Sequence, residues 1–420
     1  MNLKARACLV NLLVFSALLL LNWAQPIPAF AQSGHSVKTK RPAIEISRPG
    51  AVAVDASKRR TQLSDVNAMH MCPGSVPVGN SQVFGSVTAP RGYGLDKRYY
   101  EVGTRFRSLG AACLRGAANA CDAIHDYALD WAQSSGLGGP EGRKDKPLYW
   151  NNTLTANMRL LSPMLAALGV AEQFTPLAPG DRDVLGRWLK AKVDEYEHGM
   201  RRQGSYKGGR DGTRARKAAH NHAVQSSIAA MSYGAWSNDK KYFKTGIDQW
   251  FITLKSMRKD GSLPIETRRG ARALFYHGRT LSALVQLAER AAVQGIDLFN
   301  SAPRRNKTIH HAVAFFLDAV EEPDLVLKYA KTNKAPGPSK DYKFQDLGGM
   351  GSTMGWIAPY ISRFPDHPNS QRLIARMSST HSEPKSYLTH ELDSAVRANG
   401  FSSEWIGVDA KCLYADPRLS

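Results

Sequence analysis

The sequence predicts an all-α protein. From Arg98 onward, apolar residues recur at steps of three and four, the spacing of an amphipathic helix, and runs with the alternation of a β-strand are few. The intervening segments are rich in Gly, Pro, Asn and Asp, as turns between helices are. No repeat with the fixed period of a solenoid is present. An incomplete α/α toroid of paired helices around a central cleft and another kind of helical bundle would each bury these apolar faces.

The chain begins with a candidate export signal. A positively charged start precedes a short apolar run at 8–21, and Ala29-Phe30-Ala31 supplies the small residues that a signal peptidase needs. A transmembrane anchor is the alternative, but the apolar run is too short to span a bilayer comfortably, and prolines follow it. We therefore expect a signal peptide over 1–31, a periplasmic or secreted mature chain, and no membrane insertion of that chain.

The segment 32–70 is polar and basic with scattered Pro and Gly, which predicts a flexible basic leader. The remainder, 71–420, is long enough for one large domain or two small ones, and we expect one. Its first helix is expected to break near Gly110 or Gly116, and a long helix is expected to end just before Gly295. The predicted helices cover residues 98–133, 154–168, 181–199, 219–236, 240–257, 269–294, 307–320 and 369–377.

The formal net charge of the chain is +20. An exported protein this basic is expected to meet a polyanion or an anionic surface. Nucleic acid is a poor partner outside the cytoplasm, and no aromatic-rich nucleic-acid motif occurs. An acidic polysaccharide is therefore the expected partner, with solubility as the alternative explanation of the charge. We expect the protein to be a monomer.

Four cysteines follow the signal: Cys72, Cys113, Cys121 and Cys412. An even number in an oxidising compartment predicts disulfides, and the spacing alone leaves three pairings open. None of the four lies in a C-x-x-C motif, which argues against a zinc or redox site.

The segment 219–236 places candidate site residues beside a core stripe. That stripe is Val224, Ile228, Met231 and Ala235. His222 points to nearly the opposite side, so it is either a site residue or a solvent-exposed histidine. His220, Asn221 and His222 are candidate metal ligands, but residues two apart on a helix face different ways, unlike the four-residue spacing of a helical zinc site. We expect no metal and no cofactor.

The segment 269–294 carries a row of cations. Arg269, Arg272, Tyr276 and Arg279 follow one another at steps of three, four and three, so they would share one helix face. The core stripe beside them is Leu274, Leu281, Leu284 and Ala288. A solvated basic face is the ordinary explanation. A tyrosine is an odd member of such a face, however, and the turn at 260–264 leads sharply into the helix, which favours a site.

These residue types suit cleavage of a uronic acid polymer by β-elimination, in which the C5 proton leaves and the C4 oxygen is expelled. Arginine forks and an amide donor bind the sugar carboxylate while it takes up charge. A base must reach C5 and an acid must protonate the leaving oxygen, and both His and Tyr exchange protons. A free tyrosine has a pKa of about 10, so it needs neighbouring cations to act as a base near neutral pH.

The segment RRGARALFYHGRTLSALVQLAERAAVQGIDLF, residues 268–299, resembles the alginate lyases of polysaccharide lyase family five. The R-x-x-R-A-L-x-Y-H string of that family begins here at Arg269. Upstream, DGSLPIE resembles the family's DGFLPNE, and His-Asn-His at 220–222 stands where the family has Asn-Asn-His. WIAPY at 356–360 resembles a Trp-x-x-Pro-Tyr stretch near the family's end. The similarity runs loosely from residue 72 to residue 360 and is strong only at 260–298.

The resemblance implies an incomplete α/α toroid with the site in its cleft, acting without a metal. Asn221 and Arg269 would neutralise the substrate carboxylate, His222 would assist as neutraliser or base, and Tyr276 would be base, acid or both. A lid loop would lie at 88–100. We expect substrate contacts from Arg91 or Tyr93 of this lid and from His220, Arg272, His277, Arg279, Trp356 and Tyr360. Cys72 and Cys121 resemble a family cysteine pair, which leaves Cys113 for Cys412.

The chain also departs from this family. Ala223-Val224-Gln225 replaces Ser-Tyr-Trp, Gly278-Arg279 replaces Asn-Tyr, and the loop at 205–218 is more basic. We expect β-elimination of a polyuronate, with alginate (polymannuronate) as the default and polyglucuronate or another acidic exopolysaccharide as the alternative. A non-catalytic protein that binds such a polymer in export or assembly would also explain the charge. A glycoside hydrolase would need two carboxylates, and near the string we find only Glu266.

Overall fold

The computed structural model describes residues 41–64, 72, 83, 97–134, 136–137, 160–203, 221–304, 306–332, 354–378 and 410–414. In these ranges the backbone forms helices and turns, and the only β-pairing is an isolated bridge between Arg304 and Lys307. The prediction of an all-α protein is confirmed. No helix in these ranges is both long and apolar enough to cross a bilayer.

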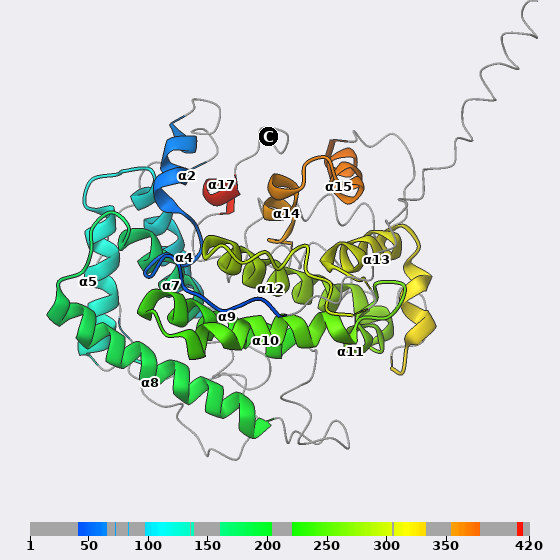
Figure 1. Cartoon of the computed structure of the whole chain (residues 1–420), viewed down its shortest axis with the longest axis horizontal. Coiled ribbons are helices and arrows are strands. Elements are labelled where there is room, and N and C mark those ends of the chain that lie inside the picture. The colour runs from blue at the N-terminus through cyan, green and yellow to red at the C-terminus, as the bar shows by residue number, and fades with distance from the viewer. Residues whose placement is uncertain are drawn as a thin grey trace, which may run out of the picture. The chain divides into compact units, whose positions relative to one another are not determined.

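The helices are labelled in Figure 1. In chain order they are α2 (Ala56–Leu63), α4 (Lys97–Leu114), α5 (Ala120–Gln133), α7 (Ser162–Ala171), α8 (Pro179–Gln203), α9 (Asn221–Ser237), α10 (Lys240–Ser256), α11 (Pro264–Thr267), α12 (Ala273–Val293), α13 (Ile309–Glu321), α14 (Ile357–Arg363), α15 (Pro368–Ser378) and α17 (Ala410–Tyr414), with 3-10 helices η3 (Gly270–Arg272) and η4 (Pro323–Tyr329).

Helix α9 is the central element of the fold. It packs against α7, α8, α10 and α12, and Figure 1 shows it flanked by α10 and α12. Its residues are mostly small or apolar, so it can be buried on nearly all sides. A Cβ added at Gly234 would lie 2.2 Å from the backbone nitrogen of Phe243, so only glycine allows α9 and α10 to approach this closely.

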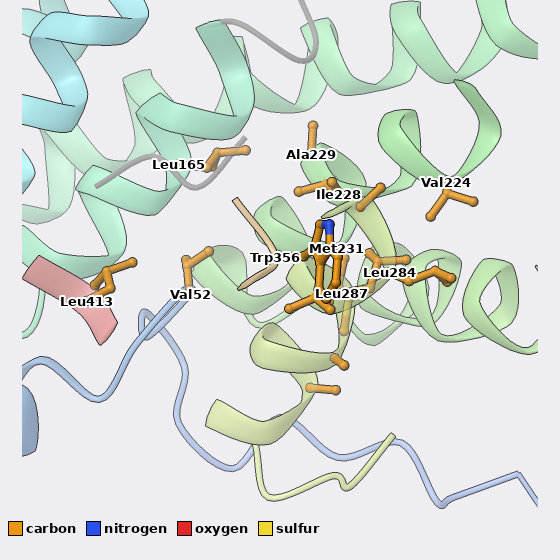
Figure 2. Close-up of a cluster of buried hydrophobic side chains, with 14 of the residues drawn as sticks. Val52, Leu165, Val224, Ile228, Ala229, Met231, Leu284, Leu287, Trp356 and Leu413 are labelled. Carbon is orange, nitrogen blue, oxygen red and sulfur yellow. The ribbon is translucent and has the colours of Figure 1, made fainter. Parts of the chain in front are cut away.

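The predicted core stripes of α9 and α12 are confirmed. The side chains of Val224, Ile228, Met231, Ala235, Leu274, Leu281, Leu284 and Ala288 are all fully buried. Figure 2 shows part of this cluster, in which side chains of α9 and α12 meet Leu165 of α7 and Val52 from the N-terminal segment. The core therefore joins elements from across the described chain.

The helix predicted over 269–294 begins later, at Ala273. Gly270, the first residue of η3, has a φ of +61°, which an α-helix does not allow, so Arg269 and Arg272 precede the α-helix. At the other end the prediction is correct, because Gly295 has a φ of +79° directly after the last turn. The helix predicted over 98–133 breaks at Gly116, where φ is +81°.

The prediction of a flexible leader over 32–70 is wrong for residues 41–64. Ala51, Val52 and Ala53 are buried, and Val52 packs so closely on Gly169 that an added Cβ there would lie 2.6 Å from it. The Gly50 N–H donates to the Ala235 carbonyl oxygen at 3.0 Å. The compact unit accordingly runs from Lys38 to Ser420, and its N-terminal boundary lies well before residue 71.

The disulfide pairing inferred from the resemblance is also wrong. Cys113 pairs with Cys121, and Cys72 pairs with Cys412. The turn between α4 and α5 brings the Cα atoms of Cys113 and Cys121 to 4.8 Å from each other. This distance lies within the usual range for a disulfide, so the local pair can bond directly. The second pair joins residues 340 positions apart. It is supported by Arg59 of α2, whose Nε donates to the Cys412 carbonyl oxygen at 2.7 Å.

Candidate active site

The candidate site is built around the start of α9. Asn221 is the first residue of that helix, and its side chain is fully buried. Its backbone N–H, which has no acceptor inside the helix, donates to Oε1 of Glu266 at 2.8 Å. Its amide nitrogen lies 3.2 Å from both carboxylate oxygens of Glu266. Among the residues that the structure describes, Asn221 Oδ1 has no hydrogen-bond partner.

Glu266 is placed by a tight turn that precedes α11. Gly261 has a φ of +86°, and an added Cβ there would lie 2.0 Å from the His311 carbonyl oxygen. The Asp260 carboxylate accepts bonds from the Ser262 backbone and hydroxyl at 3.0 and 2.7 Å. This turn directs the chain into α11, whose first residue is Pro264. The segment 260–266 thereby places the Glu266 carboxylate beside the first residue of α9, Asn221.

The Glu266 side chain is fully buried, and its charge is matched by nitrogen donors. Arg269 Nε lies 3.2 Å from Oε2 of Glu266, while about a third of the Arg269 side chain remains exposed, at 33%. Burial raises the pKa of the Glu266 carboxyl above its ordinary value, and Arg269 and Asn221 act in the opposite direction. The carboxylate thus links the two groups that were predicted to bind a substrate carboxylate.

Tyr276 joins this group through Arg269. The Arg269 guanidinium carbon lies 3.8 Å from the centroid of the Tyr276 ring, within cation–π distance. The Phe275 ring meets the Tyr276 ring edge to face, with centroids 5.1 Å apart. Tyr276 remains half-buried on the first turn of α12. Asn221, Glu266, Arg269 and Tyr276 therefore form one connected set.

The other predicted cations and the histidine lie close to this set along the chain. Arg272 ends η3 and Arg279 lies on α12, both half-buried, with the Arg279 guanidinium carbon 5.3 Å from the Phe275 ring centroid. His222 is half-buried and follows Asn221 on α9. Because α12 begins at Ala273, Arg269 reaches Tyr276 from a 3-10 turn and not from the same helix face.

His277 was predicted to contact substrate, and the structure contradicts this. Its side chain is buried, Nε2 lies 3.1 Å from the Ala312 carbonyl oxygen, and the ring packs beside Phe315 and Phe316. Burial lowers the pKa of His277 to about 4. The neutral imidazole donates a hydrogen bond to the Ala312 carbonyl oxygen and so joins α12 to α13.

Trp356 and Tyr360 are likewise core residues and do not contact substrate as predicted. Both side chains are fully buried, and their rings meet edge to face with centroids 6.1 Å apart. The Tyr360 hydroxyl lies 2.7 Å from Nδ1 of His310. These two residues join α14 to α13. Of the remaining predicted contacts, His220, Arg91 and Tyr93 lie outside the described residues. So do residues 88–96 of the lid predicted at 88–100, whereas residues 97–100 belong to α4.

Two residues of the site escaped the sequence reasoning. Glu266 was considered only as an acid for hydrolysis, although its place at the end of DGSLPIE, three residues before Arg269, was a usable signal. Gln225 is fully buried one helical turn after Asn221, and neither atom of its amide has a hydrogen-bond partner within the described ranges. Within the same ranges, no group of three His, Cys, Asp or Glu side chains is arranged to hold a metal ion.

Sequence comparison identifies similar proteins. Residues 150–326 match the family model described as alginate lyase. Three similar proteins are an alginate lyase of Pseudomonas syringae pv. tomato (27% identical over 150 residues, 36% of each chain), an alginate lyase of Azotobacter vinelandii (26% over 161 residues, 38% of this chain and 40% of that protein), and a polysaccharide lyase of Stenotrophomonas maltophilia (25% over 151 residues, 36% and 40%). The match thus spans less than half the length of these relatives.

Solved structures extend the similarity over more of the chain. Alginate lyase A1-III, as a histidine-to-alanine variant complexed with tetrasaccharide, has a TM-score of 0.64 at 19% identity and covers 88% of this chain and 96% of its own. The structure of alginate lyase A1-III from Sphingomonas species A1 has a TM-score of 0.59 at 20% identity and covers 77% and 91%. The resemblance to alginate lyases is confirmed, and so is the fold class, an incomplete α/α toroid.

Proposed function

We propose that this chain, which resembles alginate lyases, is a polysaccharide lyase that cleaves a polyuronate by β-elimination. One observation carries the proposal: the buried Glu266 carboxylate joins Asn221 to Arg269, and the Arg269 guanidinium lies over the Tyr276 ring. Binding of a basic protein to an acidic polymer would not require a phenol held against a guanidinium. The proposed substrate is alginate, rich in mannuronate, because two of the three similar proteins described above are alginate lyases.

In this mechanism Arg269 and Asn221 bind the sugar carboxylate. An amide nitrogen carries two hydrogens, so the Asn221 side chain can donate one to Glu266 and one to the substrate. The guanidinium and the amide then stabilise the negative charge that develops on the carboxylate as C5 loses its proton. His222 and Tyr276 transfer the proton from C5 and to the C4 oxygen that leaves. The product carries a new C4–C5 double bond.

A different uronate is the second substrate to test. Gln225 and Arg279 stand where the resembled family has aromatic residues, and the Gln225 amide is buried with neither atom partnered within the described ranges. Polar groups in place of aromatic ones alter which hydroxyl arrangement fits beside Asn221. Polyglucuronate therefore belongs in the substrate panel with polymannuronate.

We also propose that the protein acts in the periplasm or outside the cell. The charged and apolar start of the chain, the small residues at 29–31, and the two disulfides all fit export to an oxidising compartment. Mass spectrometry of the mature protein from an expressing cell would give its first residue, expected to be Gln32.

The test of the proposed function is an ultraviolet assay for the new double bond on a panel of acidic polysaccharides. Wild-type protein is expected to produce unsaturated oligosaccharides from at least one polyuronate, and Tyr276→Phe is expected to lose at least 10²-fold in kcat. Tyr242→Phe is a matched control, because the Tyr242 hydroxyl bonds Asp194 on α8, away from the site. Salt-sensitive binding without any unsaturated product would instead identify a polysaccharide-binding protein.

A further inference from the structure

Glu266 is a fully buried carboxyl side chain beside the predicted site residues. It lies on the short helix α11 and has no exposed surface. Its carboxylate oxygens lie against three nitrogen atoms: the backbone nitrogen of Asn221 at 2.8 Å, the side-chain amide of Asn221 at 3.2 Å, and Nε of Arg269 at 3.2 Å.

We propose that Glu266 is a positioning residue for the elimination reaction: its carboxylate holds the Asn221 amide and the Arg269 guanidinium at one spacing, so that both meet the carboxylate of the substrate. This inference rests on the proposed function. In this role, both oxygens of the Glu266 carboxylate must accept hydrogen bonds. It also excludes Glu266 as the acid of a glycoside hydrolase, because that acid must reach the bond that breaks.

The acceptor requirement follows from the partners. All three nitrogen atoms are donors, and an ionised carboxylate offers acceptors only. A glutamine of the same shape would offer one acceptor and one donor, so its NH₂ group would face either Asn221 or Arg269. One of the two substrate-binding groups would then lose its anchor. An aspartate keeps both acceptors but is one methylene shorter.

The charge is held at a cost to stability. Burial raises the pKa of Glu266, and among the charged groups of α11, α12 and η4, Arg269 and Arg268 are those that counter this shift. A carboxyl with a raised folded pKa contributes stability that is complete below its unfolded pKa and is lost as the pH rises through the folded value. Ionisation of Glu266 therefore costs stability that a non-titrating side chain at this position would keep. A carboxyl retained at such a cost points to a functional use.

The experiment compares Glu266→Gln and Glu266→Asp with wild type, using kcat on the best polyuronate and Tm by calorimetry. A positioning role predicts that kcat falls in the order Glu, Asp, Gln, with Gln about 10²-fold below wild type. It also predicts that Glu266→Gln has an unchanged or higher Tm. A role in packing alone predicts the opposite order, because glutamine preserves the volume and aspartate leaves a cavity.

Glu289→Gln is the matched control. Glu289 is also a buried glutamate bound to an arginine, with Oε1 accepting from Arg363 Nε at 2.9 Å, but on the far part of α12. This variant is expected to keep the wild-type kcat. If wild type is active and Glu266→Gln is as active as Glu289→Gln, or if Glu266→Gln fails to fold, the inference is overturned while the lyase assignment stands. If wild type yields no unsaturated product from any polyuronate, the proposed function itself fails.

Discussion

Tyr276 and His277 are neighbours in the chain, yet only one of them belongs to the site. Tyr276 is half-buried under Arg269, whereas His277 is buried and bonds Ala312 on α13. A helix turns by about 100° per residue, so adjacent side chains face different neighbours. The sequence shows the pair Tyr-His, but which member faces the site depends on where α12 lies relative to α13. Asn221, Arg269 and Tyr276 were predictable as a group, but the carboxylate of Glu266 that joins Asn221 to Arg269 was not.

The buried His277 predicts a loss of stability in acid. Its folded pKa is lowered to about 4 by burial, while a histidine in an unfolded chain titrates near 6.5. The unfolded chain thus takes up the proton first as the pH falls. The stabilising contribution of neutral His277 is complete above pH 6.5 and is lost as the pH falls toward 4, by up to about 3 kcal/mol.

Urea unfolding of wild type and His277→Gln at pH 7 and pH 4.5 measures this contribution. Glutamine keeps an N–H donor for Ala312 and does not titrate, so the variant is expected to lose less stability between the two pH values. His310 and His125, whose pKa values are also lowered to about 4 by burial, contribute the acid sensitivity that remains. Equal losses in both proteins would contradict the prediction.

At the scale of elements, the long helices with one apolar face were predictable and the short ones were not. α9, α10, α12 and α13 are where the periodicity places them, apart from a few residues at their ends. The short elements α2, α11, α14 and α17 have too few turns to show a period. Their place is fixed by tertiary contacts, as where Cys412 of α17 is bonded to Cys72.

The turn that precedes α11 offers a test at this scale. Gly261→Ala would put a side chain at a φ of +86° and within 2.0 Å of the His311 carbonyl oxygen, so either the turn or α13 must move. The free energy of unfolding is expected to fall by at least about 2 kcal/mol. Because this turn carries Glu266, kcat is expected to fall as well.

Gly180→Ala is the control for that substitution. Gly180 lies in the first turn of α8, and an added Cβ would meet no atom within 4 Å. Alanine is the better helix former, so this variant is expected to be as stable as wild type or slightly more stable. A Gly261→Ala protein as stable as the Gly180→Ala protein would show that the turn does not constrain its neighbours.

At the scale of the whole molecule, the first and last segments that the structure describes, residues 41–64 and 410–414, are joined by direct contacts. The N-terminal segment lies on α9 through Gly50 and on the end of α12, where Gln294 Nε2 donates to the Ala51 carbonyl oxygen at 2.7 Å. α2 in turn bonds the carbonyl oxygen of Cys412 in α17. Composition alone suggested a flexible leader because the segment is polar, but several of its apolar residues, Val52 among them, are buried, and several of its polar atoms are hydrogen-bonded.

The two disulfides are expected to contribute unequally to stability. Cys72–Cys412 has a sequence separation of 340, and Cys113–Cys121 one of 8. In the chain-entropy account, a disulfide stabilises by restricting the unfolded chain, so removal of the long-range bond is expected to cost about 6 kcal/mol and removal of the short-range bond about 2.5 kcal/mol. Chemical unfolding of Cys412→Ser with Cys72→Ser, and of Cys113→Ser with Cys121→Ser, measures both. Equal losses would show that native packing, and not loop length, decides their contribution.

In the export that we propose for this chain, the bond between Cys72 and Cys412 also sets an order of events. A polypeptide threaded through a translocation pore from its N-terminus delivers Cys72 early and Cys412 almost last. The earlier thiol must therefore stay reduced, or be exchanged by a disulfide isomerase, until nearly the whole polypeptide has crossed. Cys113 and Cys121 leave the pore in quick succession and can be oxidised while the rest is still in transit.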